Sequence, residues 1–175
     1  MKSRGIILQA SARSVGNTSK IVSFVHEKTQ YDVVDLATLN IGHFDYDFKN
    51  QDDDFPRLIQ RIADSYDVVL LATPVYWYTM SGLLKVFLDR ISDCLIKDKT
   101  TGRKLRGKSL GLLICGSEAE ETIGFDIPIK SAAAYLGMDY LNYVHTWIEK
   151  DEIPLEVNNR LVHYLDNISV AAINE

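Results

Sequence analysis

The segment Ser11–Ser19 (SARSVGNTS) concentrates side chains that could bind a phosphate group. It follows a short apolar run, Gly5–Leu8, typical of a buried strand, and it precedes an apolar patch that fits a helix packed on a sheet. The first turn of a helix leaves N–H groups without partners and carries partial positive charge, and the hydroxyls and Arg13 add further donors. The helix end alone is worth about 0.3–1 kcal/mol to an anion. We therefore predict a strand ending near Ala10, a phosphate-binding loop that relies on its side chains, and a helix starting near residue 17 or 18.

The alternative for this loop is a plain strand–loop–helix turn in which Asn17 or Thr18 is the N-cap. The loop is neither a Walker A motif nor the GxGxxG of dinucleotide-binding folds. These differences argue against a P-loop NTPase and against an ordinary dinucleotide-binding domain.

A second loop, Thr73–Thr79, contains three consecutive aromatic residues, Tyr76, Trp77 and Tyr78, between a buried strand and a helix. An aromatic wall suits a flat conjugated ligand, because it stacks on the ring and excludes water. The alternative is that these side chains fill an apolar gap or a subunit interface. We expect at least one of them to lie at an interface, because three such side chains cannot all face one small ligand.

A third loop, Gly116–Gly124, combines a glycine that permits close backbone approach with an acidic run. Its glutamates, Glu118, Glu120 and Glu121, are expected to be solvated or to cap a helix, with ligand contact as the alternative. Nothing in their spacing demands a carboxylate pair for acid–base catalysis.

Strand and helix signals alternate along the chain that carries these loops. Strands are expected at residues 5–8, 31–36, 67–72, 109–115 and 139–147, the last suited to a sheet edge. Helices are expected to begin near residues 17, 53, 80 and 154, and one more to end at Gly137. The third has Leu84, Phe87, Leu88, Ile91 and Leu95 on one face. The basic stretch 97–108 is expected to be a solvated loop, in preference to a nucleic-acid patch.

This alternation predicts a three-layer α/β sandwich with a five-stranded parallel sheet. The loops after the first, third and fourth strands leave its carboxyl edge, where ligands bind in such folds.

Composition narrows the functional classes. The 175 residues fit a single domain, 1–175, and the net charge of −5 disfavours a nucleic-acid or acidic-membrane partner. The two cysteines, Cys94 and Cys115, lie far apart in apolar contexts, so they predict buried thiols in a reducing cytoplasm and neither a disulfide framework nor a metal cluster. No signal peptide and no membrane span are expected.

Two motifs resemble those of the flavodoxin-like NAD(P)H-dependent FMN reductases. The family motif GSxRxxGNT corresponds to ASARSVGNT at residues 10–18, with only the leading glycine different. The motif (S/T)PVYxxxxSxxLKxFxDR corresponds to TPVYWYTMSGLLKVFLDR at residues 73–90. The resemblance covers nearly the whole chain and is strongest to the branch with iron–sulfur flavoproteins and related quinone reductases.

The resemblance implies a flavodoxin-like sheet of order 2-1-3-4-5, an FMN cofactor, NAD(P)H as co-substrate and a quinone, flavin or similar small molecule as electron acceptor. It implies that loop one holds the FMN phosphate, that loop two borders the isoalloxazine and that loop three closes the other side. No side chain is assigned as a catalytic acid, base or nucleophile, because the flavin carries the redox chemistry. The resemblance also implies a homodimer or homotetramer. The cofactor-binding residues expected are Ser11, Arg13, Ser14, Gly16, Asn17, Thr18, Pro74, Val75, Tyr76, Trp77, Gly116 and Ser117.

The chain departs from the iron–sulfur members at residues 41–54, which contain no cysteine, so a cluster held there is not expected. The four histidines, His26, His43, His145 and His163, are scattered and show no metal-ligand spacing. Two other functions stay open: a flavodoxin-type one-electron carrier that does not oxidise NAD(P)H, and a flavin-free domain that binds another phosphorylated ligand or a protein. The sequence does not distinguish NADH from NADPH.

Overall fold

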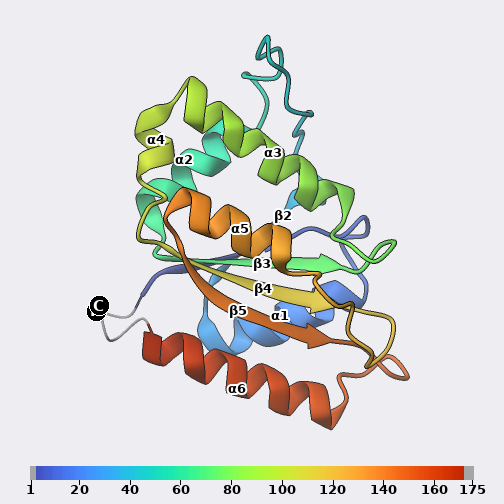
Figure 1. Cartoon of the computed structure of the whole chain (residues 1–175). Coiled ribbons are helices and arrows are strands. Elements are labelled where there is room, and N and C mark those ends of the chain that lie inside the picture. The colour runs from blue at the N-terminus through green and yellow to red at the C-terminus, as the bar shows by residue number, and fades with distance from the viewer. Residues whose placement is uncertain (1–2, 172–175) are drawn as a thin grey trace.

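A computed structural model describes residues 3–171 and shows a central sheet between two layers of helices (Figure 1). In chain order the elements are β1 (Gly5–Gln9), α1 (Asn17–Thr29), β2 (Asp32–Asp35), the 3-10 turn η1 (Leu36–Thr38), α2 (Phe55–Ser65), β3 (Val68–Pro74), α3 (Gly82–Ile96), α4 (Lys99–Arg103), β4 (Ser109–Cys115), α5 (Ile127–Leu136), β5 (Asp139–Thr146) and α6 (Leu155–Ala171).

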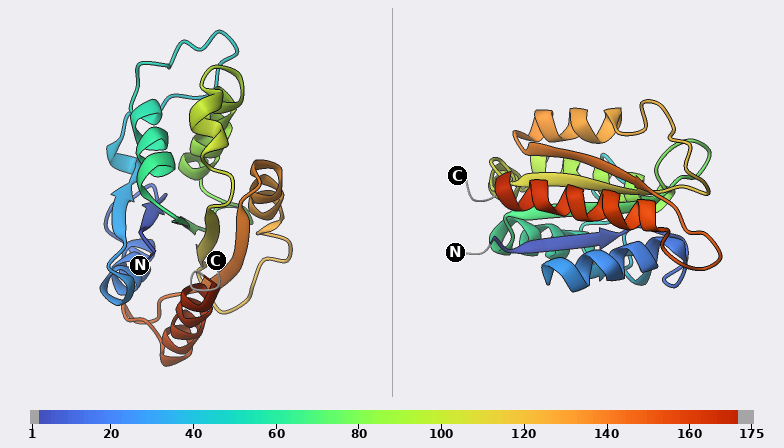
Figure 2. Two further views of the ribbon diagram at one scale, coloured as in Figure 1. Left: turned by 90° about the vertical axis from the view of Figure 1, so that its left-hand side faces the viewer. Right: turned by 90° about the horizontal axis from the view of Figure 1, so that it is seen from below.

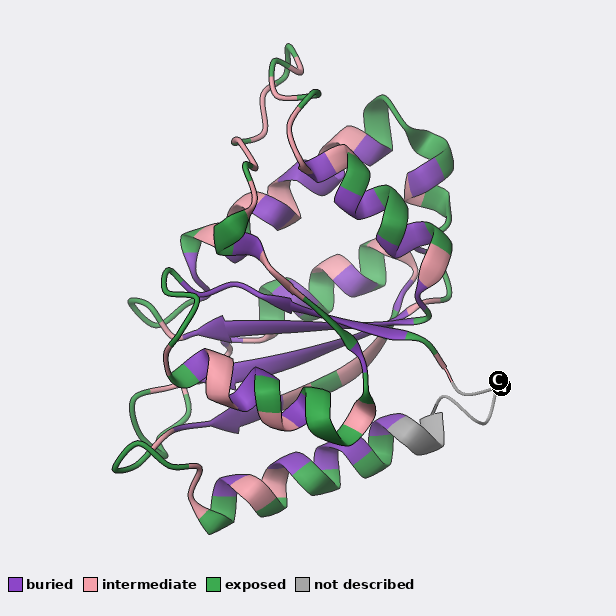
Figure 3. Cartoon of the chain, turned by 180° about the vertical axis from the view of Figure 1, so that it is seen from behind, coloured by how far each residue is buried: buried purple, intermediate pink, exposed green. Residues whose placement is uncertain are grey.

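All strand pairs are parallel, in the order β2-β1-β3-β4-β5. This confirms the predicted flavodoxin-like order, with β5 at an edge. Figure 2 shows α1 and α6 on one face of the sheet and α2, α3 and α5 on the other. The central strands are buried on both faces (Figure 3), which explains their continuous apolar sequences.

The alternation of side chains divides the core in two. β1 directs Ile6 and Leu8 toward the layer of α2, α3 and α5, and Ile7 toward the layer of α1 and α6. Burial of these apolar side chains, at about 25 cal/mol per Å² of apolar surface, is what fixes the sheet under its helices.

Three sequence predictions need correction. Residues 97–108 are not all loop, because Asp98 accepts hydrogen bonds from Thr101 N and Thr101 Oγ1 and caps the short helix α4. β3 extends two residues beyond the predicted end, to Pro74, because Thr73 and Pro74 continue its pairing with β4. The apolar face of α3 does not include Leu95, which is 38 % exposed.

The position that sequence periodicity missed in α3 is Arg90, which is fully buried. Its guanidinium forms ion pairs with Asp53 and Asp93, donates to the carbonyls of Gly42 and Asn50, and lies 4.8 Å over the Phe55 ring. Arg90 thereby ties α3 to the 40–54 segment, which projects from the top of the molecule in Figure 1.

Candidate active site

The three predicted loops meet at the carboxyl edge of the sheet. Gln9 pairs with Ala72, and Pro74 pairs with Cys115, so β1, β3 and β4 are neighbours and end close together. The chain after each strand therefore enters the same region of the surface. This is the ligand-binding edge of an open parallel sheet.

The first loop is held in shape by its own hydrogen bonds. Gln9 Nε2 donates to the carbonyl of Ser14 at 3.0 Å, and Ser11 Oγ accepts from Arg13 N at 3.4 Å. Gly16, not Asn17 or Thr18, is the N-cap of α1, and Ser19 Oγ accepts from its N–H at 2.9 Å. The N-cap of the alternative interpretation, Asn17 or Thr18, is thus one or two residues too late, because the helix already begins at Asn17.

The N-terminus of α1 keeps donors available for an anion. Gly16 has no side chain to accept from the first turn, so no N-cap side chain pairs with the first N–H groups of α1 among the described residues. Arg13 is exposed beside them. Thr18 itself is buried against Cys115, so its backbone rather than its hydroxyl is offered to the loop.

A buried serine joins the first loop to the second. Ser81 Oγ donates to the carbonyl of Ala10 at 2.6 Å and accepts from Leu84 N at 3.1 Å as the N-cap of α3. Ser81 N in turn donates to Thr73 Oγ1 at 3.0 Å. One side chain therefore sets the end of β1 and the start of α3, the two elements between which the loops open.

The aromatic loop is a tight turn with unusual backbone angles. Tyr76 N donates to the carbonyl of Thr79 at 2.9 Å, and Thr79 N donates back to Tyr76 at 3.1 Å. The two central residues, Trp77 and Tyr78, have φ of 49° and 63°, a region that favours glycine and asparagine. A bulky aromatic residue at such angles costs conformational energy. Trp77 and Tyr78 are also 91 % and 76 % exposed, and strained, exposed residues of this kind are typical of functional surfaces.

The third loop packs against a buried histidine. His145, on β5, is 3 % exposed, and its Nε2 lies 2.9 Å from the carbonyl of Glu118. A Cβ at position 116 would lie 2.7 Å from His145 Cε1, so Gly116 is required for this close contact. The hydrogen bond and the glycine together fix the start of the loop against β5.

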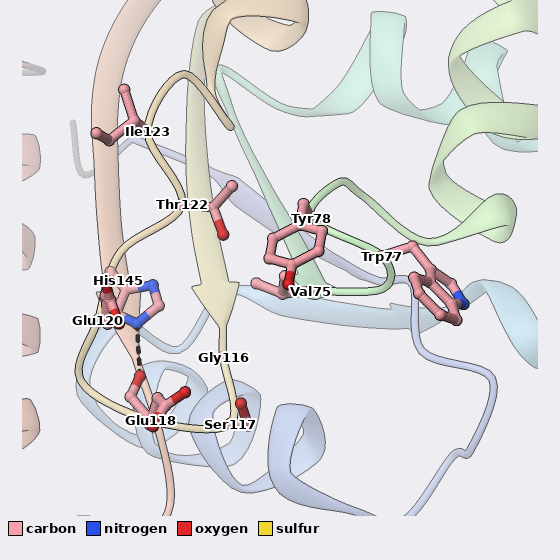
Figure 4. A pocket seen from close by; sticks show the side chains of 10 residues that line it. All are labelled: Val75, Trp77, Tyr78, Gly116, Ser117, Glu118, Glu120, Thr122, Ile123 and His145. Atoms are coloured by element: carbon pink, nitrogen blue, oxygen red, sulfur yellow. Dashed lines mark hydrogen bonds between the residues drawn. The ribbon is translucent and has the colours of Figure 1, made fainter.

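A pocket of about 520 Å³ opens between the second and third loops (Figure 4). This volume falls in the range of small-molecule sites. Val75 and Tyr78 stand in the middle of the view, with Trp77 on one side and the chain from Gly116 on the other. The pocket is lined by Val75, Trp77, Tyr78, Gly116, Ser117, Glu118, Glu120, Thr122, Ile123 and His145.

The predicted site residues divide into three groups. Val75, Trp77, Gly116 and Ser117 line the pocket. The first-loop residues gather at the N-terminus of α1 on the same sheet edge but do not line this pocket. Pro74 is buried within β3, and Tyr76 is 40 % exposed outside the pocket lining.

Several pocket and supporting residues were not among the predicted site residues. Tyr78 and His145 line the pocket, although in the sequence Tyr78 is one of three adjacent aromatics and His145 is an isolated histidine. Gln9 and Ser81 act on loop backbone across the fold, which no local pattern reveals. The SxxL spacing at Ser81–Leu84 is the one signal that could have identified an N-cap.

The titratable groups near the pocket argue against a side-chain nucleophile. Burial raises the pKa of the Cys115 thiol, and the hydroxyls of Thr18 and Thr146 only partly offset that effect. Burial also raises the pKa of Tyr143, whose hydroxyl donates to Glu121 at 3.0 Å. Residues 3–171 contain no group of three His, Cys, Asp or Glu side chains that could hold a metal ion.

The residues present fit FMN. A helix N-terminus with uncapped N–H groups, Asn17 and an exposed Arg13 suit a phosphate dianion. The adjacent pocket has aromatic and backbone walls that suit a flat ring. The two features lie on one sheet edge, an arrangement that suits a ligand with both a phosphate and a flat ring.

The fold and site define a flavodoxin-like domain, and comparison with known proteins agrees. A family model described as NADPH-dependent FMN reductase matches residues 4–152, so the chain belongs to this family. A structure of Trp repressor binding protein from Bacillus subtilis superposes with a TM-score of 0.72 at 20 % identity, over 92 % of this chain and 95 % of that one.

Two relatives are similar in sequence. A Burkholderia 2-hydroxy-1,4-benzoquinone reductase is 30 % identical over 149 residues, 81 % of this chain and 74 % of that protein. A Bacillus subtilis (strain 168) protein named "Putative NAD(P)H-dependent FMN-containing oxidoreductase YwqN" is 30 % identical over 95 residues. That match spans 51 % of this chain and about half, 52 %, of YwqN.

Family membership confirms the class predicted from the two motifs: an FMN-dependent NAD(P)H oxidoreductase domain, with FMN as cofactor and NAD(P)H as co-substrate. Within residues 3–171 no helix has the length and apolarity needed to cross a bilayer.

Proposed function

We propose that this protein transfers two electrons from NAD(P)H, through bound FMN, to a quinone. The overall reaction consumes NAD(P)H, one proton and a quinone and yields NAD(P)⁺ and a hydroquinone. The observation that carries the proposal is the pocket of about 520 Å³ between the aromatic turn and the Gly116 loop, on the same edge as the α1 N-terminus. The Burkholderia relative, named as a benzoquinone reductase, supports a quinone as the acceptor.

In this proposal the first loop binds the FMN phosphate. Arg13 and the first-turn N–H groups of α1 offset its charge, and Ser11, Ser14, Gly16, Asn17 and Thr18 shape the loop around it. A charge-assisted hydrogen bond from a guanidinium is worth about 1.5–3 kcal/mol, more than the helix end supplies. The loop is held by Gln9 and Ser81, so the binding geometry exists before the ligand arrives.

The second and third loops bind and shield the ring. FMN, when bound, supplies the acceptor and donor of hydride, and the protein supplies position and exclusion of water. Trp77 and Tyr78 provide aromatic surface, Val75 and Ser117 border the ring, and Gly116 allows the backbone to approach it. Pro74 and Tyr76 set the strand end and the turn that present this surface.

We further place the protein in the cytoplasm as a homodimer or homotetramer. Both cysteines, Cys94 and Cys115, are buried free thiols, as suits a reducing compartment. The rim of the pocket exposes large apolar side chains, with Trp77 at 91 %, Tyr78 at 76 % and Ile123 at 100 % exposure. Such a concentration is typical of a surface covered by another subunit, which would then close the pocket.

The test is a visible spectrum of the purified protein before and after addition of FMN, followed by NADH or NADPH without air and then by 1,4-benzoquinone. The proposal expects a bound-flavin spectrum that bleaches promptly and returns on addition of the quinone. Bound flavin that resists both nicotinamides would indicate a one-electron carrier. No bound flavin would contradict the proposal and leave the first loop to another phosphorylated ligand.

A further inference from the structure

We propose that Glu118 and Glu120 make the pocket in which an acceptor would meet the FMN ring selective for uncharged quinones over anionic acceptors. The inference rests on the proposed function and specifies the substrate class of the same site. It starts from the charges of the residues that line the pocket.

The charged side chains that line the pocket are all of one sign. Its lining contains the two carboxylates of Glu118 and Glu120, and no lysine or arginine. The remaining polar groups are the indole N–H of Trp77, the hydroxyls of Tyr78, Ser117 and Thr122 and the buried imidazole of His145. Figure 4 shows that Glu118 and Glu120 come from the loop after β4, across the pocket from Trp77.

The neighbouring residue Glu121 is a carboxylate whose charge is balanced by partners. Glu121 accepts from Tyr143 Oη at 3.0 Å and forms an ion pair with Arg160 at 3.2 Å. Within residues 3–171, Glu118 and Glu120 have neither kind of partner for their carboxylates. Their charges therefore act on whatever enters the pocket.

Two cations at this edge of the sheet are paired, and Lys150, exposed in the turn after β5, does not line the pocket. Arg160 also pairs with Glu156 and lies 5.1 Å over the Trp147 ring, and Lys20 pairs with Asp151. Arg13 is exposed, but in the proposed function it binds the FMN phosphate, which itself adds negative charge. An anionic acceptor in the pocket would thus lie beside two carboxylates with no lysine or arginine in the lining.

The start of the third loop is held beside the pocket. The backbone of Glu118 is anchored by His145, and Gly116 is in close contact with the same ring. Two like charges about 8 Å apart at an effective dielectric of about 40 repel enough to reduce an association constant about fivefold. A quinone without charge avoids this cost. For NAD(P)H the reduced nicotinamide ring is uncharged, so in this proposal the ring enters the pocket and the anionic phosphates lie outside the lining that Glu118 and Glu120 form.

The experiment compares kcat/KM of the FMN-loaded enzyme for 1,4-naphthoquinone and for 1,4-naphthoquinone-2-sulfonate. The measured quantity is the ratio of anionic to neutral kcat/KM in each variant divided by the same ratio in the wild type, which cancels the intrinsic reactivity of the two quinones. The double variant Glu118→Gln/Glu120→Gln is expected to raise this ratio about tenfold or more. Raising the ionic strength from about 0.02 to 0.3 M should raise the ratio of anionic to neutral kcat/KM in the wild type. The same change should have little effect on this ratio in the double variant.

The matched control is Glu27→Gln/Asp139→Asn, which changes net charge by the same amount. Glu27 lies near the end of α1 and Asp139 starts β5, so both exposed side chains lie at the opposite edge of the sheet. The control should leave the ratio at its wild-type value. An equal rise in both double variants would show a net-charge effect and overturn the assignment. An unchanged ratio in Glu118→Gln/Glu120→Gln, with quinone reduction intact, would overturn this inference alone. Failure of the wild-type enzyme to reduce either quinone would instead reject the proposed function.

Discussion

Two groups of charged residues in this fold have opposite surroundings. Arg90 is fully buried and bonds to Asp53 and Asp93, two carboxylates that are largely covered, and these three residues form the Arg90 cluster. Glu118 and Glu120 are exposed at the pocket and have no ion pair among the described residues. Removing Arg90 or its partners should therefore cost stability, whereas the charges of Glu118 and Glu120 can act on a ligand.

The contrast also separates two roles within one motif. The 73–90 motif that resembles FMN reductases contains Val75 and Trp77, which line the pocket, and Arg90, which holds the 40–54 segment to α3. A motif therefore marks residues that a fold requires together, and geometry decides which of them meets the ligand.

The largest expected effect is the loss of the Arg90 cluster. Arg90→Met removes the cation and leaves Asp53 buried without its partner, which costs about 3–5 kcal/mol of unfolding free energy. Urea denaturation followed by circular dichroism measures this loss. Lys85→Met, which breaks the exposed ion pair with Asp89 on the same helix, should cost less than about 1 kcal/mol. Equal effects of the two variants would contradict the contrast.

The sequence predicted much of the fold because the signals were local. The continuous apolar character of β3 and β4, the glycine after α5 and the alternation of elements defined the sheet and its layers. What could not be predicted depends on long-range contacts. Arg90 meets Gly42 and Asp53 across 48 and 37 residues, and Ser81 meets Ala10 across 71. No periodicity within α3 distinguishes a buried arginine from an exposed one.

The site shows the same division. The first and second loops were predicted because hydroxyls, Arg13 and three aromatics stand together in sequence. His145 could not be assigned, because its partners, Gly116 and the Glu118 carbonyl, lie about 30 residues earlier on another element. The positive φ angles of Trp77 and Tyr78 were also beyond prediction, because aromatic residues rarely adopt them.

The next effect falls on ligand affinity instead of stability. Arg13→Ala removes an exposed guanidinium with no ion pair in the described part of the chain, so the melting temperature without ligand should stay within about 1 °C. FMN affinity should fall about tenfold to a hundredfold, the equivalent of a charge-assisted hydrogen bond. Fluorescence titration measures the affinity. Unchanged binding would remove Arg13 from the phosphate site.

A smaller effect should come from crowding the third loop. Gly116→Ala places a Cβ 2.7 Å from His145 Cε1, so the loop or the ring must shift, at a cost of about 1–3 kcal/mol. Gly82→Ala is the control, because a Cβ there has no neighbour within 4 Å at the start of α3. Thermal unfolding should separate the two variants. A Gly116→Ala protein as stable as Gly82→Ala would show that this contact does not hold the loop.

The smallest effect is the pH dependence of the Arg90 cluster. Burial alone would raise the pKa of Asp53, but hydrogen bonds from Arg90 and from the N–H groups of Gly42 and Phe55 outweigh it and lower the pKa below the usual 3.8. The resulting stabilisation is present above about pH 5 and is lost as the pH falls through the ordinary value toward the lowered one, at about 1.4 kcal/mol per unit of pKa shift. Denaturation midpoints between pH 5 and 3 should fall less steeply for Asp53→Asn than for the wild type. Parallel slopes would contradict the assignment.

The most direct test of the proposed site compares FMN with riboflavin, which lacks the phosphate, in parallel fluorescence titrations of the wild-type protein. If loop one binds the phosphate and the aromatic turn covers the ring, both ligands lose flavin fluorescence on binding, and FMN binds about a hundredfold more tightly. Equal affinities would show that the α1 N-terminus does not hold the phosphate. Absence of binding by either flavin would contradict the account as a whole.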